Sequence, residues 1–393
     1  MSKTVCMIAL ASYPGDPRIR RQAEALDAAG YKVDIICRHS GIQKKVEEFG
    51  NVTAHRIMKA QRKDTMIRYL LSSTLFLVLA FVKIQTLAFH RKYRFIQVHN
   101  MPDYLIFAAI VQKILGVPLL LDIHDLTVEL FEEKWPEEKH KLLKKIVRFG
   151  EKISCRVANK VITVSETCGQ RLIARGVPAE KITLVFNSAD EEIFKYRNRE
   201  FPKLTAGVKL LYHGTISPRF GIHYAIEAMK EINKKIPGSV LLLYGRYEIG
   251  YREYLEKITN ELQLTECVEF NGLIPREKIP EIIYKSDVGI IPYPNTDYMN
   301  LALPTKAFEY ISSGLPVIIS RLNDFSLLFP ENSVQYIDNV SSQEIAEAVF
   351  YLSNNPDIRK NQVENALKKL QFISGEMMKQ RYLNLVSLFN SKI

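Results

Sequence analysis

The feature that most constrains the fold of this chain is a regular alternation between short apolar runs and segments with helical periodicity. Such runs are typical of strands buried on both faces of a parallel sheet. Their alternation with helices predicts an α/β fold. In the first half, strands are expected at 4–10, 32–38, 95–98, 117–122, 160–164 and 181–185, and helices at 17–29, 66–89, 102–115, 139–157 and 166–175. In the second half, strands are expected at 208–214, 239–245, 267–271, 287–292, 316–320 and 334–337, and helices at 222–235, 251–263, 276–285, 305–313 and 342–354.

Two such series do not fit easily into one sheet, so the sequence predicts two Rossmann-like domains. The first is expected over 1–195 and the second over 205–373, with the polar stretch 195–207 as the linker. The segment 357–391 is expected to be helical, and its end, about 374–393, to pack back on the first domain. Open α/β sheets bind ligands at the carboxyl ends of their strands. Two facing sheets therefore predict a ligand site in a deep cleft between the domains.

Composition excludes several classes of protein. With 393 residues, 47% hydrophobic and 25% charged, the chain is an ordinary globular protein rather than a disordered, collagenous or polytopic membrane one. Its five cysteines form no CxxC pair, which argues against a disulfide framework and against a zinc or redox site. The first residues run into a strand-like segment without the features of a signal peptide, so we expect a cytoplasmic protein.

Charge is distributed unevenly along the chain. Residues 1–200 contain 33 Lys and Arg against 22 Asp and Glu, whereas residues 201–393 contain 21 of each, so the net charge of +11 lies in the first half. A basic field of this kind attracts a polyanion or an anionic membrane surface. No basic-aromatic groove or zinc finger indicates nucleic acid as the partner.

An apolar stretch within that basic half favours the membrane. Residues 69–82 carry no charge, and basic residues flank both ends. The stretch is shorter than the about 20 residues of a spanning helix. It fits either a helix lying in the plane of an anionic membrane, with residues 56–94 as the contact, or an ordinary core helix. The flanking basic residues are Arg56, Lys59, Arg62, Lys63 and Arg68 before it, and Lys83, Arg91, Lys92 and Arg94 after it.

Several common nucleotide and hydrolase motifs are missing. The chain has no GxGxxG after a strand, no GxxxxGK[ST] and no GxSxG. It also has no D-x-D pair to hold a metal–nucleotide complex. A bound diphosphate would then be neutralised by helix amides and basic side chains rather than by a metal.

Five junctions carry candidate ligand groups. Gly15 lies in the turn after the first strand, and Arg219 precedes the helix at 222. Lys306 and Glu309 lie on one face of the short helix after Pro304, where they fit either an intrahelical ion pair or a phosphate-binding lysine with a ribose-binding carboxylate. The other groups follow two strands of the first domain: Asn100, Asp103, Asp122, His124 and Asp125.

Taken together, these segments resemble the GT-B glycosyltransferases of family 4. The resembling pieces are PGDPRIR at 14–20, DIHDL at 122–126, VFNSADEEIF at 185–194, HGTISPRFGI at 213–222 and PTKAFEYISSGLPVI at 304–318. The resemblance implies two facing Rossmann-like domains and retaining transfer of a sugar from a nucleotide-sugar donor without an essential metal. The donor would bind the second domain and the acceptor the first. Front-side attack, with the leaving phosphate accepting the acceptor's proton, is the mechanism it implies.

The resemblance also assigns residue roles. It places His124, Arg219, Lys306 and Glu309 in the catalytic machinery, with Glu309 binding the ribose hydroxyls. The donor side consists of Gly15, Gly214, Thr215, Arg246, Leu273, Ile274, Asn300, Ala302, Leu303, Thr305 and Glu309, and the acceptor side of Asp16, Asn100, Asp103 and Asp125. The chain departs from the family pattern at Thr215 and Phe220, where the family has Gly and Lys, and at Leu301, where it has the first of two glutamates.

The expected acceptor is a glycan or a polyprenyl-diphosphate-linked sugar at the cytosolic face of the cell membrane, where the protein would be peripheral. Two other functions remain open. A nucleotide-sugar epimerase of the same fold would make product without an acceptor. A catalytically silent membrane-associated scaffold would bind no nucleoside diphosphate.

Overall fold

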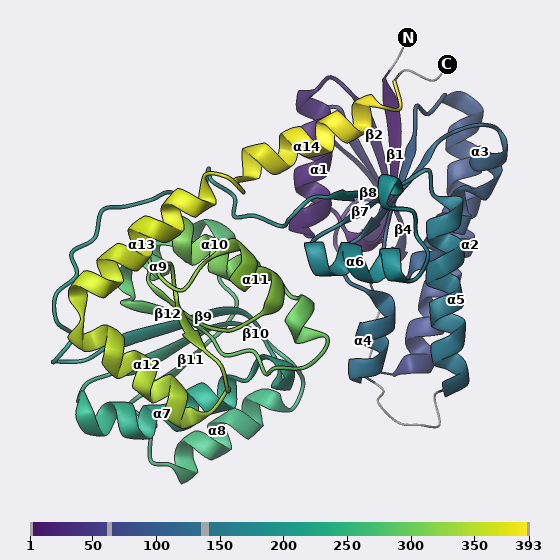
Figure 1. Cartoon of the computed structure of the whole chain (residues 1–393). Coiled ribbons are helices and arrows are strands. Elements are labelled where there is room, and N and C mark those ends of the chain that lie inside the picture. Colours follow the sequence, from purple (N-terminus) through teal and green to yellow (C-terminus); the bar gives the residue numbers. More distant parts are fainter. Residues whose placement is uncertain (1–2, 61–64, 135–140, 391–393) are drawn as a thin grey trace. The chain divides into compact units, whose positions relative to one another are not determined.

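The computed structural model describes residues 3–60, 65–134 and 141–390 of the chain. The chain divides into two compact units: Met1–Phe186 with Glu376–Ile393, and Asn187–Gly375. Each has one sheet with helices packed on it (Figure 1). The division falls before the predicted linker. Residues 195–207 have no regular structure but are bonded to the second unit, where Arg199 donates to the carbonyl of Ser286 and the Leu204 amide to that of Ser353.

Unit 1 contains an eight-stranded sheet in the order β3-β4-β2-β1-β5-β6-β7-β8. All pairs are parallel except β3 with β4. The strands β5 and β6 at the centre of the sheet are buried along their whole length, and β6 is apolar except for Asp122. The strands are β1 (Thr4–Ser12), β2 (Lys32–His39), β3 (Val46–Phe49), β4 (Val52–Lys59), β5 (Ile96–His99), β6 (Leu119–Ile123), β7 (Lys160–Thr163) and β8 (Ile182–Leu184).

The sequence-based prediction missed the hairpin formed by β3 and β4. β3 is an edge strand without buried residues, and β4 buries two polar residues, His55 and Arg56. Their partners lie elsewhere in the chain: His55 bonds to Asp34 at 2.8 Å, and the Arg56 guanidinium donates to the carbonyl of Tyr13 at 2.9 Å. Neither strand therefore shows an apolar run in the sequence.

Helices cover both faces of this sheet (Figure 1). On one face, Tyr382 and Leu385 of α14 join the core formed with β1, β2 and α1. On the other face lie α2, α3 and α5. Two departures from prediction occur here: 102–115 forms a 3₁₀ helix followed by a short α-helix, and α4 was not expected. The helices are α1 (Pro17–Ala28), α2 (Met66–His90), η1 (Asp103–Ala109), α3 (Ile110–Ile114), α4 (Thr127–Lys134), α5 (Lys141–Val157), α6 (Glu166–Ala174), η3 (Ala179–Lys181) and α14 (Gly375–Ser387).

Unit 2 contains a six-stranded parallel sheet in the order β11-β10-β9-β12-β13-β14. All six strands were predicted. The strands are β9 (Lys209–Ile216), β10 (Val240–Tyr247), β11 (Val268–Asn271), β12 (Val288–Ile291), β13 (Val317–Ser320) and β14 (Gln335–Ile337). The fold class, α/β with two Rossmann-like domains, is thereby confirmed, whereas the cleft between the domains stays a prediction.

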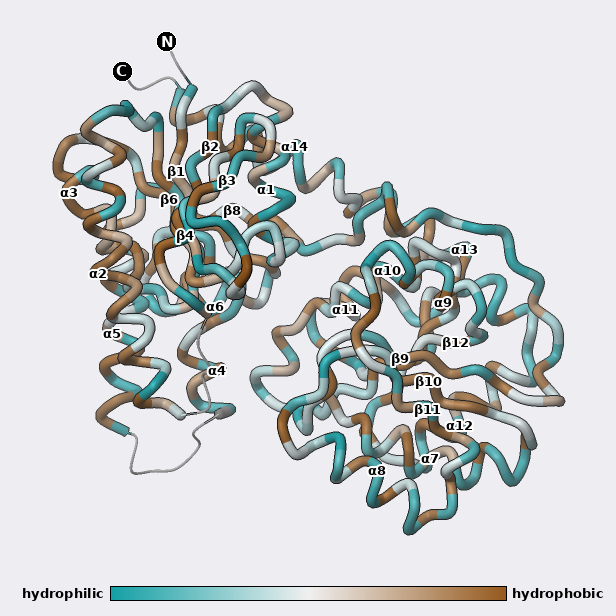
Figure 2. Tube along the Cα trace, turned by 180° about the vertical axis from the view of Figure 1, so that it is seen from behind, coloured by the Kyte–Doolittle hydropathy of each residue, from teal (hydrophilic) through white to brown (hydrophobic). Residues whose placement is uncertain are grey.

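Helices surround the sheet of unit 2, and Figure 2 shows its strands as apolar stretches inside a more polar shell. α11 was not predicted, and the expected helix 357–391 is two helices, α13 and α14, separated by residues 371–374. The helices are η4 (Pro218–Phe220), α7 (Ile222–Lys235), α8 (Tyr251–Glu261), η5 (Arg276–Lys278), α9 (Ile279–Lys285), η6 (Met299–Leu301), α10 (Thr305–Ser312), α11 (Asn323–Leu328), α12 (Ser342–Asn354) and α13 (Pro356–Leu370).

Candidate active site

Two glycines open the carboxyl edge of the unit 2 sheet. Gly214 of β9 lies beside Gly245 of β10, with φ of 114° and 151°. A Cβ on Gly245 would approach the Gly214 carbonyl oxygen to 1.7 Å, so only glycine fits there. The two strands thus leave bare backbone at the edge where parallel sheets bind ligands. Thr215 and Arg246, both predicted on the donor side, follow these glycines and are exposed.

Glu309 of α10 lies at the same edge and is held by a histidine. Its Oε2 is 2.7 Å from Nε2 of His213 on β9. Burial raises the pKa of Glu309, but the hydrogen bond and charge of His213 outweigh it, so that the pKa lies below its usual value. Glu309 is therefore an ionised carboxylate only 9% exposed. His213 belongs to the segment at 213–222, but its role could not be predicted from the sequence, because its contact with Glu309 spans 96 residues.

Lys306, one turn before Glu309, lies in a box of aromatic rings. Its Nζ is 3.7 Å from the centroid of Tyr212 and 5.4 Å from those of Phe220 and Tyr293. Within the described chain it has neither a hydrogen bond nor an ion pair, and its residue is 9% exposed. Burial lowers its pKa to about 7, against an opposing effect of Glu309. Of the two interpretations left open by the sequence, the intrahelical ion pair is thus not formed, and the ammonium of Lys306 is instead surrounded by rings.

Arg219 and Phe220 form the short helix η4 after β9. The Arg219 guanidinium lies 4.9 Å from the Phe220 centroid, and this side chain is half-buried without an ion pair to a described acid. Gly221 follows with a φ of 67°, and a Cβ there would meet the Pro292 carbonyl oxygen at 2.1 Å. The turn into α7 is therefore fixed, and it holds Arg219 next to the aromatic box of Lys306.

The remaining donor-side residues follow β11 and β12 in the chain. Leu273 is a large apolar side chain that is 74% exposed, which suits stacking with a planar ring, and Ile274 follows it. Arg276 is 3.0 Å from Asp190 and adds to the charges that lower the pKa of Glu309. Asn300, Ala302, Leu303 and Thr305 are partly exposed around the start of α10.

In unit 1, His124 follows β6 and belongs to a buried cluster. Its Nδ1 is 3.2 Å from Oδ1 of Asp122, and Nδ1 of His99 is 3.2 Å from Oδ2 of the same carboxylate. Burial opposes ionisation of Asp122, yet His124 and His99 together hold its pKa far below the usual range. The His99 and His124 rings stack at 5.3 Å. The cluster thus fixes the orientation of the His124 ring at the carboxyl edge of the sheet.

This histidine–aspartate cluster also has the composition of a metal site. The candidate ligand atoms of His99, Asp122 and His124 all lie within 4.8 Å of one another. Asp122 additionally accepts hydrogen bonds from Gln22 at 2.7 Å and Gln97 at 3.3 Å. Both of these bonds reach Oδ2, whereas Oδ1 of Asp122 and both ring nitrogens of His99 have no hydrogen-bond partner among the described residues.

The four residues predicted on the acceptor side mostly serve the fold. Asn100 donates to Asp103 at 3.0 Å and to the Asp125 carbonyl at 2.7 Å, and its oxygen accepts from the His124 amide. Asp103 is fully buried, which raises its pKa. Asp16 caps α1 and bonds Arg18. Asp16 and Asp125 are partly accessible, whereas Asp103 is buried, and its contact with a ligand stays a prediction.

Gly15 was predicted to bring its backbone close to a diphosphate. It is exposed in the turn before α1, where a Cβ would meet only the Ser12 side chain at 2.8 Å. Its φ is not in the left-handed region, so the turn itself does not require glycine.

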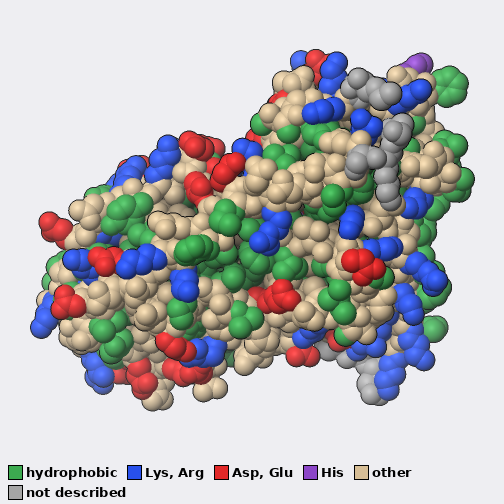
Figure 3. Space-filling view, turned by 45° about the horizontal axis from the view of Figure 1, so that its top comes forward, with side chains coloured by type: hydrophobic (Ala, Val, Ile, Leu, Met, Phe, Trp, Pro, Cys, Tyr) green, Lys and Arg blue, Asp and Glu red, His purple; other side chains and the backbone are tan. Residues whose placement is uncertain are grey.

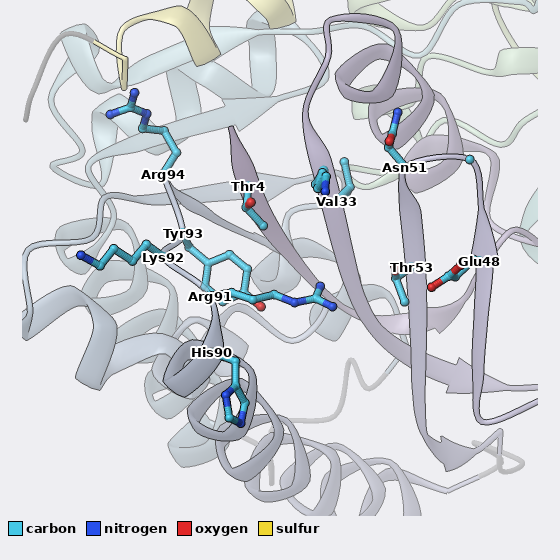
Figure 4. A pocket seen from close by; sticks show the side chains of 12 residues that line it. Thr4, Val33, Glu48, Asn51, Thr53, His90, Arg91, Lys92, Tyr93 and Arg94 are labelled. Carbon is cyan, nitrogen blue, oxygen red and sulfur yellow. The ribbon is translucent and has the colours of Figure 1, made fainter. Parts of the chain in front are cut away.

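A hollow of about 760 Å³ lies at the opposite edge of the unit 1 sheet (Figure 4). Its lining comes from the amino ends of β1 and β2 and from residues 90–94. Arg91 is bonded to buried Asp34, and Lys92 and Arg94 point away from Glu48. The basic groups do not converge on one point, and the hollow lies at the edge of the unit 1 sheet opposite to His124.

Two family matches cover most of the chain. Residues 15–188 match the glycosyl transferase 4-like domain, and residues 196–369 match the glycosyl transferases group 1 domain. The chain therefore belongs to the GT-B glycosyltransferases of family 4, and it is an enzyme that takes its sugar from a nucleotide-sugar donor. The resemblance on which the residue roles rest is thereby confirmed, whereas the individual roles are not tested by it.

Relatives of this family are distant in sequence. An alpha-D-kanosaminyltransferase of Streptomyces kanamyceticus is 24% identical over 275 residues, which is 66% of this chain and 67% of the relative. The amylovoran biosynthesis glycosyltransferase AmsK of Erwinia amylovora is 25% identical over 44% of this chain and 42% of its own length.

Solved structures share the fold over nearly the whole chain. The sucrose-phosphate synthase of Thermosynechococcus elongatus has a TM-score of 0.77 at 18% identity and covers 99% of this chain and 100% of its own. Anabaena HepE in complex with UDP has a TM-score of 0.71 at 17% identity, with 98% and 100% covered.

Proposed function

We propose that this enzyme is a retaining, metal-independent transferase whose unit 2 binds the nucleotide diphosphate of the donor. The observation that carries the proposal is the ionised carboxylate of Glu309 at the same sheet edge as two basic residues, Lys306 and Arg219, that have no ion pair among the described residues. Oε2 of Glu309 accepts from His213, which leaves Oε1 for the ribose hydroxyls. A nucleotide donor is also consistent with HepE, whose structures contain UDP and UDP-glucose.

The chemistry follows from where charge develops. As the bond from sugar to phosphate breaks, negative charge grows on the diphosphate and positive charge on the sugar. Lys306 and Arg219 stabilise the negative charge on the diphosphate, together with the free amides at the start of α10. Exposed Leu273 is placed to stack on the base. In this proposal His124 contacts the donor sugar, and the leaving phosphate accepts the proton of the acceptor hydroxyl as that hydroxyl attacks from the same face.

Metal independence rests on the donor set of unit 2. The groups assigned to the diphosphate are Lys306, Arg219 and backbone amides, none of which binds a hard cation, and the carboxylate of Glu309 at this edge is bonded to His213. Transfer should therefore be unchanged after the enzyme and substrates are treated with EDTA. A loss that Mg²⁺ or Mn²⁺ restores would refute this part, and a loss that only Zn²⁺ restores would point to the cluster of His99, Asp122 and His124.

For the acceptor we propose a glycan or a polyprenyl-diphosphate-linked sugar at the cytosolic face of the membrane, with the enzyme bound peripherally through residues 56–94. The supporting observation is α2. Within the described chain it is the one helix long and apolar enough to cross a membrane, yet only 28% of its most apolar window is buried. Five of its 25 residues, among them Phe76 and Ile84, are buried, so the reading of α2 as an ordinary core helix is poorly supported. Arg62 and Lys63, two of the predicted basic flanking residues, lie outside the described residues.

The test uses two variants, Glu309→Ala and Arg219→Ala, with Glu277→Ala and Arg252→Ala as exposed controls in the same unit. A thermal-shift panel with UDP, GDP, ADP and CMP identifies the nucleotide, because a ligand that binds only the folded state raises the melting temperature. The site variants should lose this shift and most of the transfer, and the controls should keep both. Near-normal turnover in both site variants would refute the assignment.

The same panel separates the two competing functions. An epimerase would convert a nucleotide sugar when no acceptor is present. A silent scaffold would show no shift with any nucleotide. We expect binding of one nucleotide and product only with acceptor.

A further inference from the structure

Helix α5 carries an exposed apolar stripe that the transferase chemistry does not use. Leu142, Ile146 and Phe149 are 72%, 56% and 64% exposed. Their spacing of four and three residues places them on one face of the helix. Ile153, four residues further, extends the stripe and is partly exposed. Such a row of large apolar side chains facing water is unusual on a soluble protein.

The opposite face of α5 is fixed to the fold, so the stripe cannot turn inward. Glu151, Ser154 and Cys155 are its buried residues. Both oxygens of Glu151 accept from Arg175, at 2.9 and 3.0 Å. Arg175 also bonds to Glu129 of α4, and thus ties α4, α5 and the end of α6 together.

One flank of the stripe is basic. Lys145, Lys152 and Arg156 are exposed and lie along one side of α5, next to the apolar row. None of the three is paired with an acid in the described part of the chain, whereas Lys144 and Arg148 share Glu132 of α4. α5 therefore presents apolar side chains and unneutralised positive charge to the same side.

Helix α2 lies on the same side of the unit 1 sheet as α5. Both helices pack against η1, and Figures 1 and 2 show α2 and α5 on the same side of the unit 1 sheet. Large exposed apolar residues recur along α2: Ile67, Leu70, Leu71, Leu75, Val78, Val82 and Phe89. In Figure 3 hydrophobic and basic side chains alternate along the right-hand margin, where these helices lie.

We propose that α5 is a second membrane-binding helix, which together with α2 lies in the surface of an anionic bilayer. The argument is complementarity: an apolar row with a basic edge matches acyl chains below a negatively charged headgroup layer. The helix is too short to span a membrane, and its fixed inner face keeps it parallel to the surface it contacts. The inference concerns a surface away from the donor site and does not depend on the nucleotide assignment.

The first experiment is flotation of the full chain with lipid vesicles. We compare Ile146→Glu/Phe149→Glu with Ile249→Glu/Leu327→Glu, which places the same charges on exposed apolar residues of unit 2. Vesicles contain about one-third phosphatidylglycerol, or phosphatidylcholine alone. The unaltered chain and the unit 2 variant should bind the anionic vesicles, and the α5 variant should bind them roughly tenfold more weakly.

A charge variant separates the two parts of the interaction. Lys145→Gln/Lys152→Gln/Arg156→Gln should lose the preference for anionic vesicles and show less dependence on salt, because each removed charge removes a screened attraction. A Val78→Glu/Val82→Glu variant tests α2 in the same assay. If only the α2 variant loses binding, α2 alone binds the membrane and the proposal for α5 is wrong.

Site-specific labelling gives the direct readout. All five cysteines are buried, so a cysteine introduced at an exposed position is the accessible thiol for a polarity-sensitive dye. Dye at Phe149→Cys should shift to the blue on addition of anionic vesicles, and dye at Leu327→Cys should not. Equal shifts at both positions, or none at Phe149→Cys, would overturn the proposal.

Sedimentation and nucleotide binding complete the controls. If the stripe instead covers a second copy of this chain, the unaltered chain sediments as a dimer that Ile146→Glu/Phe149→Glu turns into monomers, which would also overturn the proposal. All variants should keep the thermal shift with nucleotide. A variant that loses only vesicle binding therefore reports on this surface, whereas failure of the unaltered chain to bind any nucleotide counts against the proposed function alone.

Discussion

The imidazole of His213 lies 2.7 Å from Oε2 of Glu309 and 3.0 Å from the hydroxyl of Tyr310 on its other side. Tyr310 donates its single proton to the Leu211 carbonyl at 3.1 Å. Nε2 of His213 faces the ionised Glu309, and Nδ1 faces the Tyr310 hydroxyl. The ring of His213 thus orients the carboxylate and leaves its second oxygen for a ligand.

The first prediction concerns this pair. His213→Ala removes the donor to Oε2, so the carboxylate loses its fixed orientation and part of its charge compensation. Hydrogen bonds to charged groups contribute roughly 1.5–3 kcal/mol, so the dissociation constant of the nucleotide should rise about tenfold or more. Isothermal titration measures it. His223→Ala, which removes another histidine–tyrosine contact in unit 2, is the control and should bind normally.

The pH dependence of donor binding should follow Lys306. Its pKa of about 7 in the free enzyme means that about half of the molecules carry the charge near neutral pH. A diphosphate binds the protonated lysine and thereby raises the pKa of Lys306. The affinity should therefore fall as pH rises from about 7 to the pKa of Lys306 in the bound state, and should change little above it. A nucleotide sugar is the ligand to use in this measurement, because its diphosphate does not change its protonation state in this pH range. Lys306→Met should abolish the slope, and a slope of the opposite sign would contradict the prediction.

A lysine at position 220 should be able to replace Lys306 in donor binding. The family has its phosphate-binding lysine where this chain has Phe220, and the Phe220 centroid is 5.4 Å from Nζ of Lys306. We predict that Lys306→Met weakens donor binding and that adding Phe220→Lys restores a substantial part of it. Lys285→Met, on the exposed surface of α9, should have no effect. Failure of the double variant to recover, with the fold intact by circular dichroism, would show that the two positions are not equivalent.

The stability of the Lys306→Met variant independently tests whether burial lowers the pKa of Lys306. The pKa of Lys306 falls from 10.5 in the unfolded chain to about 7 in the folded one, so burying this lysine destabilises the fold fully below about pH 7 and progressively less as pH rises toward 10.5. Lys306→Met removes that effect. Its melting temperature should therefore exceed that of the unaltered chain, and the difference should shrink with increasing pH. A stabilised but poorly binding variant is the signature of a residue kept for function.

Strands with apolar runs could be predicted from the sequence, and so could the edge at which the site lies, because both depend on local pattern. What escaped prediction depends on distant partners. In β4 the buried polar residues His55 and Arg56 are bonded to Asp34 and to the Tyr13 carbonyl. His213 has a role only because the fold places Glu309 of α10 beside it. The stripe on α5 has a readable helical period, but only the packing of Glu151 shows which face points to solvent.

The last prediction tests how β12 supports the site. Gly289 lies beneath the ring of Tyr310, where a Cβ would approach a ring carbon to 2.5 Å. Gly289→Ala must therefore displace Tyr310, which is fully buried and bonds both the ring and the amide of His213. Overpacking of this kind destabilises by roughly 1–3 kcal/mol, and the disturbed His213 should weaken nucleotide binding as well.

Gly272→Ala is the matched control in the same unit, since a Cβ there meets nothing within 4 Å and the backbone is not in the left-handed region. Urea unfolding monitored by circular dichroism should show a lower midpoint for Gly289→Ala and an unchanged one for Gly272→Ala. If both variants unfold alike and bind nucleotide alike, the packing of Tyr310 on β12 does not hold His213 in place, and the support for Glu309 must come from elsewhere.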